Sequence, residues 1–296
     1  MRALVVAGLL FVTAPLLAVA QEPEEAPQIE SQEVAKGIYM ISGQGGNLGV
    51  SIGEDATFLI DDQYAPLTPA IQEAIQELGG GDVDFVLNTH FHGDHTGGNE
   101  NFGEAGALIV AHDNVRARLT SEQLVAFFDM RTPAMPKAGL PVVTFNDGVT
   151  FHINGETIHA FHVPNAHTDG DSIVHFRNAD VFHMGDVLFA GMYPFIDVGS
   201  GGSIDGVIAA LEKALEHSRA ETRFIPGHGP LIGQAEVKGQ VEMLRTVRDR
   251  VARLKSEGKS LEEVKAAEPT ADLDETWGGG FIKGPDLVTF VYESLP

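Results

Sequence analysis

The segment Thr89–His95 contains three histidines and one aspartate within six positions, in the pattern His-x-His-x-Asp-His. It follows a short apolar run, residues 84–88, that we expect to form a buried strand. A loop at the end of a strand can point several such side chains at one place. Neutral imidazole together with carboxylate is a ligand set that suits zinc better than calcium or magnesium. The motif therefore predicts a metal site, with candidate ligands His90, His92, Asp94 and His95.

Three shorter motifs farther along the chain each place one possible metal ligand after a predicted strand. They are Asn-Ala-His-Thr-Asp-Gly-Asp around His167, Met-Gly-Asp-Val-Leu-Phe around Asp186, and Pro-Gly-His-Gly around His228. Any one of them alone is more typical of a turn residue or of a hydrogen-bonded histidine. Combined with the first motif, they favour a site with more ligands than the four that a structural zinc needs. The chain has no cysteine, so a thiolate ligand or nucleophile is excluded.

The elements that must position these motifs predict a layered α/β fold. Short β-branched runs separated by glycine-containing turns predict strands in two groups, within residues 37–60 and 142–183. Apolar residues at helical spacing predict helices over residues 66–78, 204–217 and 235–257. Two strand-rich halves, each flanked by helices, favour two sheets packed face to face with helices outside them. This arrangement is a four-layer αββα sandwich.

The four motifs, in this order, resemble those of the metallo-β-lactamase superfamily, over about Gly37 to His228. The resemblance implies the αββα sandwich as the fold. It also implies two zinc ions per chain, with Asp186 bridging them. The first zinc would be held by His90, His92 and His167, and the second by Asp94, His95 and His228.

Two such ions provide hydrolytic chemistry without a protein nucleophile. Zinc lowers the pKa of bound water to about 7, and two ions about 3.5–4 Å apart can share the resulting hydroxide and polarise a carbonyl oxygen. We assign Asp94 an additional catalytic role, as the carboxylate that orients the hydroxide and helps to move its proton. The chain is thus predicted to be a zinc-dependent, β-lactamase-like hydrolase acting on a small molecule.

The residues after Asp186 differ from those of some superfamily members. The main group of dizinc β-lactamases carries cysteine at this place, followed closely by a lysine that binds the substrate carboxylate. Here Asp186 is followed by Val187, Leu188, Phe189 and Ala190, so this lysine is absent. The Gly-Asp-x-Leu-Phe setting is more similar to the bridging aspartate of glyoxalase II and of quorum-quenching lactonases. Our leading hypothesis is cleavage of an amide or ester bond in a β-lactam or lactone ring.

Three alternatives stay open at this point. A thioester or lactone hydrolase of the glyoxalase II kind is favoured by Asp186 and by the missing lysine. A mononuclear iron dioxygenase that acts on persulfides would share the first histidine motif. A non-catalytic zinc-binding domain would retain the ligands for stability alone.

The N-terminus predicts export. Arg2 precedes an apolar run, Ala3–Val19, that ends in Ala-Val-Ala, which is typical of a cleavable signal peptide over residues 1–20. Cleavage is expected near Ala20-Gln21, which would leave a secreted, periplasmic protein. We interpret residues 21–36 as an acidic linker and residues 37–296 as a single domain. No later apolar run approaches the ~20 residues of a membrane span.

The net charge of −23 makes nucleic acid an unfavourable partner, because so acidic a surface repels phosphate backbones. The oligomeric state is not predicted. The segment Thr120–Pro141 mixes aromatic residues with proline and glycine, which suits either an apolar flap over a pocket or an ordinary packed helix and turn. His162 and His183 are candidates for orienting a ligand, and Tyr193 either donates to an oxyanion or packs as a loop aromatic.

Overall fold

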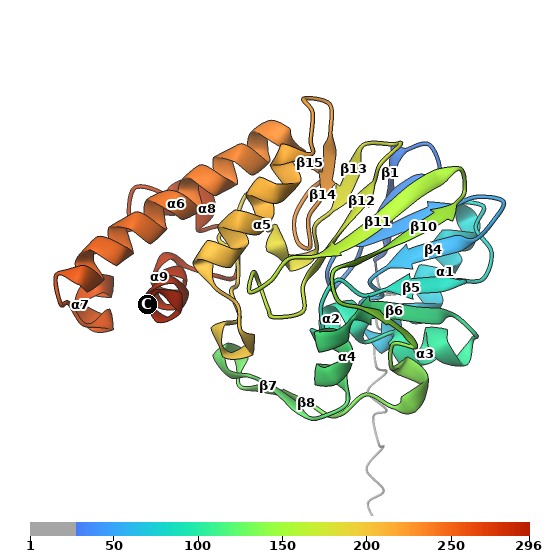
Figure 1. The fold of residues 1–296 in the computed structure, drawn as a ribbon, viewed down its shortest axis with the longest axis horizontal. Helices are drawn as coiled ribbons and strands as arrows, with labels where there is room; N and C mark the ends of the chain where they lie inside the picture. The colour runs from blue at the N-terminus through green and yellow to red at the C-terminus, as the bar shows by residue number, and fades with distance from the viewer. Residues whose placement is uncertain (1–27) are drawn as a thin grey trace, which may run out of the picture.

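The computed structural model describes residues 28–296, which form two mixed β-sheets with helices on their outer faces (Figure 1). The first sheet has the strand order β1-β2-β3-β4-β5-β6-β9. Its strands are β1 (Glu30–Ala35), β2 (Ile38–Ser42), β3 (Leu48–Ile52), β4 (Thr57–Ile60), β5 (Phe85–Leu87), β6 (Leu108–His112) and β9 (Val143–Phe145). β1 to β4 pair antiparallel, whereas β4, β5, β6 and β9 pair parallel, so the last four strands end at the same edge.

The second sheet follows in the sequence and has the order β10-β11-β12-β13-β14-β15. Its strands are β10 (Gly148–Ile153), β11 (Glu156–His162), β12 (Ser172–Phe176), β13 (Val181–His183), β14 (Arg223–Ile225) and β15 (Ile232–Gly233). All pairs are antiparallel except β13 with β14. The carboxyl ends of β13 and β14 therefore lie side by side, each followed by one of the predicted ligand motifs.

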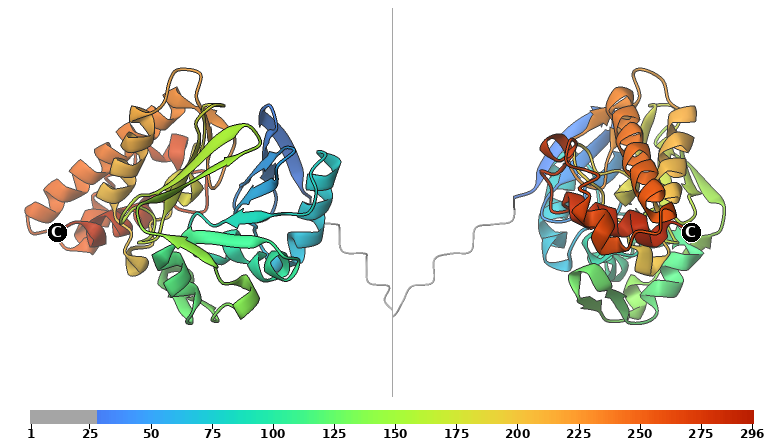
Figure 2. Two further views of the ribbon diagram at one scale, coloured as in Figure 1. Left: turned by 45° about the vertical axis from the view of Figure 1, so that its right-hand side comes forward. Right: turned by 90° about the vertical axis from the view of Figure 1, so that its left-hand side faces the viewer.

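Helices cover the outer face of each sheet, as the two further views in Figure 2 show. Their bounds are α1 (Thr68–Glu77), α2 (Gly93–Thr96), α3 (Asn99–Glu104), α4 (Asp113–Leu119), α5 (Ile204–Glu216), α6 (Gln234–Ser256), α7 (Leu261–Ala266), α8 (Asp274–Trp277) and α9 (Gly284–Ser294). The long helices α5 and α6 are amphipathic and bury their apolar stripes. Ser203 caps α5, because its side chain accepts a hydrogen bond from the backbone N–H of Gly206.

Three clusters of buried apolar side chains correspond to the three interfaces between four layers. One joins α1 to the first sheet, with Ile71 and Ile75 against Leu59. A second lies between the sheets, where Phe58 of β4 shares a core with Phe176 of β12. The largest joins the second sheet to α5, α6 and α9. The αββα sandwich predicted from the sequence is thereby confirmed.

The N-terminal boundary differs from the expected one at residue 37. Glu30–Ala35, which we expected within a linker, forms the edge strand β1 and pairs antiparallel with β2. Its side chains are mostly exposed, so the strand is held by backbone hydrogen bonds and carries no apolar pattern that would reveal it. The predicted signal peptide lies outside the described residues. None of the helices within residues 28–296 combines the length and the apolar character needed to cross a bilayer.

The segment 120–141 contains a small hairpin rather than a packed helix. β7 (Gln123–Val125) and β8 (Met130–Thr132) pair antiparallel. Asp129, in the turn between them, adopts a left-handed conformation with φ of 48°. Phe127 and Phe128 at the tip are 42% and 46% exposed, which is unusual for phenylalanine and favours the flap over the packed alternative.

Candidate metal centre

All seven predicted ligands come together at one edge of the sandwich. His90 and His92 follow β5, and Asp94 and His95 lie on the short helix α2 directly after them. The other three side chains lie in loops that follow strands of the second sheet: His167 after β11, Asp186 after β13 and His228 after β14. Crevices at the carboxyl ends of strands are where sheet proteins commonly bind ligands.

The ligand atoms form two groups. Those of His90, His92, His167 and Asp186 lie within 4.8 Å of one another, and so do those of Asp94, His95 and His228. The carboxylate of Asp186 lies between the two groups. Its Oδ2 lies 3.6 Å from His167 Nε2 and 3.5 Å from His228 Nε2, while its Oδ1 lies 3.0 Å from His95 Nε2. The arrangement is a pair of adjoining sites with a shared carboxylate.

Buried polar atoms without partners show that the two groups fit metal ions. His90 Nε2, His95 Nε2 and Asp186 Oδ1 are buried and form no well-directed hydrogen bond within residues 28–296, although His95 Nε2 and Asp186 Oδ1 lie 3.0 Å apart. Unpaired buried polar atoms are costly and rare in folded proteins. In this protein the unpaired nitrogen and oxygen atoms point toward the same place, and imidazole nitrogen with carboxylate oxygen is a donor set typical of zinc. A divalent cation at each group would satisfy these atoms.

Four of the ligand histidines are oriented by hydrogen bonds from their other ring nitrogen. His95 Nδ1 donates to Asp61 Oδ2 over 2.8 Å, and His90 Nδ1 donates to Thr89 Oγ1 over 3.0 Å. His167 Nδ1 donates to the carbonyl of Phe195, and His92 Nε2 donates to Asp197 Oδ2. In each neutral ring, a proton on the nitrogen that makes this contact leaves the other nitrogen, which faces the site, free to bind a metal.

Asp61 contributes most to this outer layer of contacts. It is fully buried at the end of β4, and besides His95 it accepts hydrogen bonds from Thr89 N and Thr89 Oγ1, both over 2.7 Å. Through Thr89 it also orients His90. Neither Asp61 nor Asp197 was predicted from the sequence. Asp61 could have been found from its position at the end of the strand next to β5.

His162 and His183, which we expected to orient a ligand, form hydrogen bonds away from the ligand side chains. His183 Nε2 donates to the carbonyl of Asn47, and His162 Nδ1 donates to the carbonyl of Asp171. Neither contacts a ligand atom. Tyr193 is fully buried, and its hydroxyl donates to Asp274 Oδ1 over 2.9 Å. It is therefore the packed loop aromatic and not an oxyanion donor.

Two glycines leave room for ligand side chains, and one asparagine holds a ligand loop in place. A Cβ at Gly46 would collide with the His95 ring, and one at Gly227 would collide with Asp186 Oδ1. Asn47 Nδ2 donates to the carbonyls of Pro226 and Gly229, which lie on either side of His228. The β2–β3 loop of the first sheet is thus tied directly to the His228 loop of the second sheet.

The electrostatics of the site favour cations. Burial lowers the pKa of His90 well below its ordinary value and that of His167 to about 4, so both rings are neutral and free to bind metal. Burial opposes ionisation of Asp94, yet His95 and His228 lower its pKa to about 2. Burial acts against protonation of His228 too, but Asp186 and Asp94 raise its pKa to about 9. The carboxylates attract positive charge, which bound metal would supply in place of protons.

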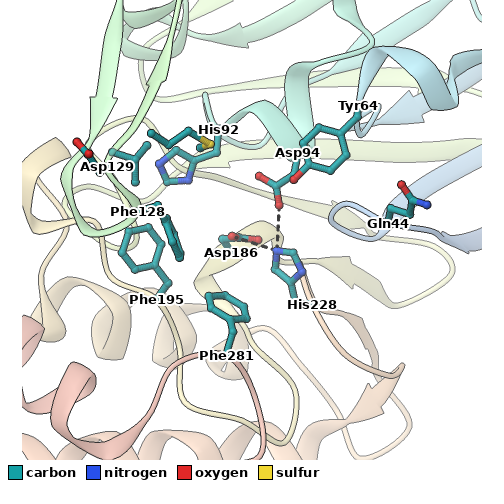
Figure 3. Close-up of a pocket in the computed structure, with 12 residues that line it drawn as sticks. Gln44, Tyr64, His92, Asp94, Phe128, Asp129, Asp186, Phe195, His228 and Phe281 are labelled. Carbon is teal, nitrogen blue, oxygen red and sulfur yellow. Dashed lines mark ion pairs between the residues drawn. The ribbon is translucent and has the colours of Figure 1, made fainter.

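A pocket of about 630 Å³ opens onto this centre (Figure 3). His92, Asp94, Asp186 and His228 lie at its base, and the dashed ion pairs in Figure 3 join His228 to both aspartates. Its walls come from five separate segments and comprise Gln44, Tyr64, Val125, Phe128, Asp129, Met130, Phe195 and Phe281. The β7–β8 hairpin therefore forms one wall of the pocket.

The comparisons with known proteins agree with this geometry. The model of the metallo-beta-lactamase superfamily matches residues 46–228, which is more than half of the chain and includes all seven ligands. The chain belongs to this superfamily. A metallo-beta-lactamase from Pontibacter korlensis has the same fold, with a TM-score of 0.60 and 17% identity over 74% of this chain and 99% of that one.

Curated relatives of this superfamily member include two hydroxyacylglutathione hydrolases. The one from Methylococcus capsulatus is 28% identical over 70% of this chain and 72% of its own length. The one from Gloeobacter violaceus is 26% identical over 60% of this chain and 62% of its own length, which is less than two-thirds. Together with the ligand groups, these matches place the chain among the metallo-hydrolases of the superfamily.

Proposed function

We propose that the protein is an exported dizinc hydrolase that cleaves an uncharged carboxylic ester, such as a lactone or another ester with an apolar chain. The two adjoining ligand groups around Asp186 support two ions rather than the single iron of a persulfide dioxygenase. Seven ligands also exceed what one structural zinc requires, which argues against a non-catalytic zinc domain. Export rests on the predicted signal peptide.

The seven ligands would hold two zinc ions. One ion would be bound by His90, His92 and His167, and the other by Asp94, His95 and His228. Asp186 would bind both ions. When bound, the ions would supply a hydroxide at neutral pH and polarise the substrate carbonyl. Asp94 lines the pocket and is ionised, so its carboxylate can accept a hydrogen bond from the attacking water and orient it.

The proposed substrate class rests on the mostly apolar character of the pocket wall. Among the described residues, the wall includes no lysine or arginine, and its one charged side chain away from the ligands is Asp129. Six of the large apolar residues that are exposed gather at or beside this pocket: Tyr64, Leu124, Phe127, Phe128, Met130 and Phe281. A carboxylate-bearing β-lactam or a glutathione thioester would find no cationic partner on this wall.

A matched substrate pair tests this proposal. Two phenyl esters with acyl chains of equal length, one ending in methyl and one in carboxylate, are compared with nitrocefin and an acyl-homoserine lactone. We expect kcat/KM to be at least about tenfold higher for the neutral ester. This factor corresponds to about 1.4 kcal/mol of lost binding free energy, because the carboxylate of the other ester would be left without a partner. Preference for the carboxylate-bearing ester, or for nitrocefin, would overturn the proposed substrate class while leaving the metal centre in place.

Phe128 is expected to contribute to binding of the apolar chain. It is 46% exposed, lines the pocket and lies 5.1 Å from the Phe195 ring. Phe128→Ala should raise KM for a long-chain ester by about tenfold, because burial of such a side chain is worth about 1.5–3 kcal/mol, and should leave acetyl ester hydrolysis nearly unchanged. Leu124→Ala, on the same hairpin but outside the pocket wall, is the control. Equal effects of the two variants would contradict a direct contact with the substrate.

A further inference from the structure

A second pocket, of about 680 Å³, lies on the outer face of the second sheet beside α5. It is formed by β10, β11 and β12, by the C-terminal part of α5 and by the loop after it, which all lie next to one another in Figure 1. It shares no residue with the pocket of the metal centre. The superfamily hydrolase function assigns it no role.

Three basic side chains line this pocket: Arg177, Lys213 and Arg219. None of them forms an ion pair with a carboxylate within residues 28–296, whereas Arg118, Arg131, Arg245, Arg248 and Arg250 all do. Asp147 is the one acidic residue in the described lining. The chain has only 19 basic residues against 42 acidic ones, so three unpaired cations around one pocket are a pronounced local excess.

Two histidines form part of the floor of the pocket. His159 and His175 lie directly opposite each other on β11 and β12, so their side chains share the outer face. The His175 ring stacks on Phe182 at 3.9 Å, and its Nε2 is buried with no hydrogen-bond partner among the described residues. Burial lowers the pKa of His175 to about 4, with Arg177 acting in the same direction and Asp180 against it. The ring is therefore neutral, and it closes the floor of the pocket without adding charge.

The geometry of these histidines does not suit a metal ion. His159, His175 and His217 line the same pocket, but their ring nitrogens do not converge. Within the described residues, the metal-binding groups are those of the candidate metal centre. The cationic side chains would also repel a metal ion. An anion is the ligand that this lining favours.

We propose that this outer pocket binds a small phosphate-bearing molecule. Arg177, Lys213 and Arg219 surround the phosphate, whose several oxygens can accept more hydrogen bonds than a carboxylate offers. The neutral His175 ring closes the floor. Lys213 Nζ lies over the Phe161 ring at 4.6 Å, which holds this cation at the pocket wall. The net charge of −23 disfavours extended anionic partners such as nucleic acid, whereas a small anion would contact only the local cationic lining.

Calorimetric titration of the metal-loaded protein tests this proposal, with inorganic phosphate and glycerol 3-phosphate as probes at fixed ionic strength. Wild type is compared with Arg177→Gln/Lys213→Gln and with Arg253→Gln, which removes an exposed charge of α6 outside the pocket. We expect the double variant to bind glycerol 3-phosphate at least tenfold more weakly and Arg253→Gln to bind like wild type. Unchanged binding by the double variant would place the phosphate at the metal centre and overturn the proposal, as would an absence of binding to wild type.

Two further readouts complete the experiment. Ester hydrolysis and the melting temperature of the double variant should match those of wild type, because Arg177 and Lys213 make no contact with the metal centre. Co-sedimentation with vesicles containing phosphatidic acid, compared with vesicles of phosphatidylcholine alone, distinguishes a lipid headgroup from a soluble phosphate. Vesicle binding that is lost in the double variant would assign the phosphate to a lipid. Vesicle binding that is equal in both proteins, with no soluble-phosphate response, would overturn the pocket assignment.

Discussion

Asp186→Asn should remove about one metal equivalent per chain and lower kcat/KM for a neutral ester by about 10²–10⁴-fold. The substitution keeps the shape of the side chain but removes the charge that both ligand groups share. Stabilisation of the transition state by a metal ion is worth several kcal/mol, and each 1.36 kcal/mol is a factor of ten in rate. Elemental analysis of the gel-filtered protein and initial-rate kinetics measure the two effects.

Asp129→Asn is the matched control for this variant. Asp129 lines the same pocket but belongs to neither ligand group. Asparagine tolerates its left-handed backbone, so the hairpin turn should be retained. We expect unchanged metal content and a change in kcat/KM of no more than about threefold, as for an ordinary surface substitution. An Asp186→Asn enzyme that keeps two metals and full activity would be incompatible with a bridging carboxylate.

Asp61→Asn is expected to produce the second largest loss, about 10–100-fold in metal affinity and in activity at limiting zinc. Asp61 touches no substrate and acts as a positioning residue. Its two carboxylate oxygens accept hydrogen bonds from His95 Nδ1, Thr89 Oγ1 and Thr89 N, and in asparagine one of these oxygens becomes an NH2 group that would face a donor. The His95 ring would then lose its fixed tautomer. A zinc titration against a competing chelator measures the affinity.

Asp62→Asn separates this positioning role from a general loss of stability. Asp62 is the adjacent, equally buried aspartate, but its Oδ1 accepts a hydrogen bond from Gly98 N and no ligand histidine depends on it. Burial raises the pKa of Asp62 well above its ordinary value, so the neutral amide should be tolerated. We expect zinc affinity close to that of wild type. Loss of zinc affinity in both variants to the same degree, with matching drops in the melting temperature of the metal-free protein, would assign Asp61 a merely structural role.

The ligands were predictable from the sequence because each of them lies within a few residues of a strand end. His90, His92, Asp94 and His95 share one loop and its helix, so their spacing alone indicates a common target. His167, Asp186 and His228 required the assumption that the ends of separate strands meet, which the parallel pairing of β13 with β14 satisfies in part.

The outer contacts were not predictable because they depend on register between distant segments. Asp61 and His95 lie 34 positions apart and meet only because β4 pairs parallel with β5. Asp197 and His92 are 105 positions apart and belong to different sheets. Local patterns also failed at β1, whose polar, exposed side chains conceal an edge strand. In segment 120–141, proline and glycine obscured the hairpin that forms the pocket wall.

The central claim is that two metal ions at the adjoining ligand groups perform the hydrolysis. The most direct test measures metal content per chain and ester hydrolysis on the same sample, before chelation, after chelation and after zinc is restored. We predict about two zinc ions per chain, complete loss of hydrolysis on chelation, and recovery when zinc is added. One iron per chain with oxygen consumption and no ester hydrolysis, or full hydrolysis by metal-free protein, would contradict the account.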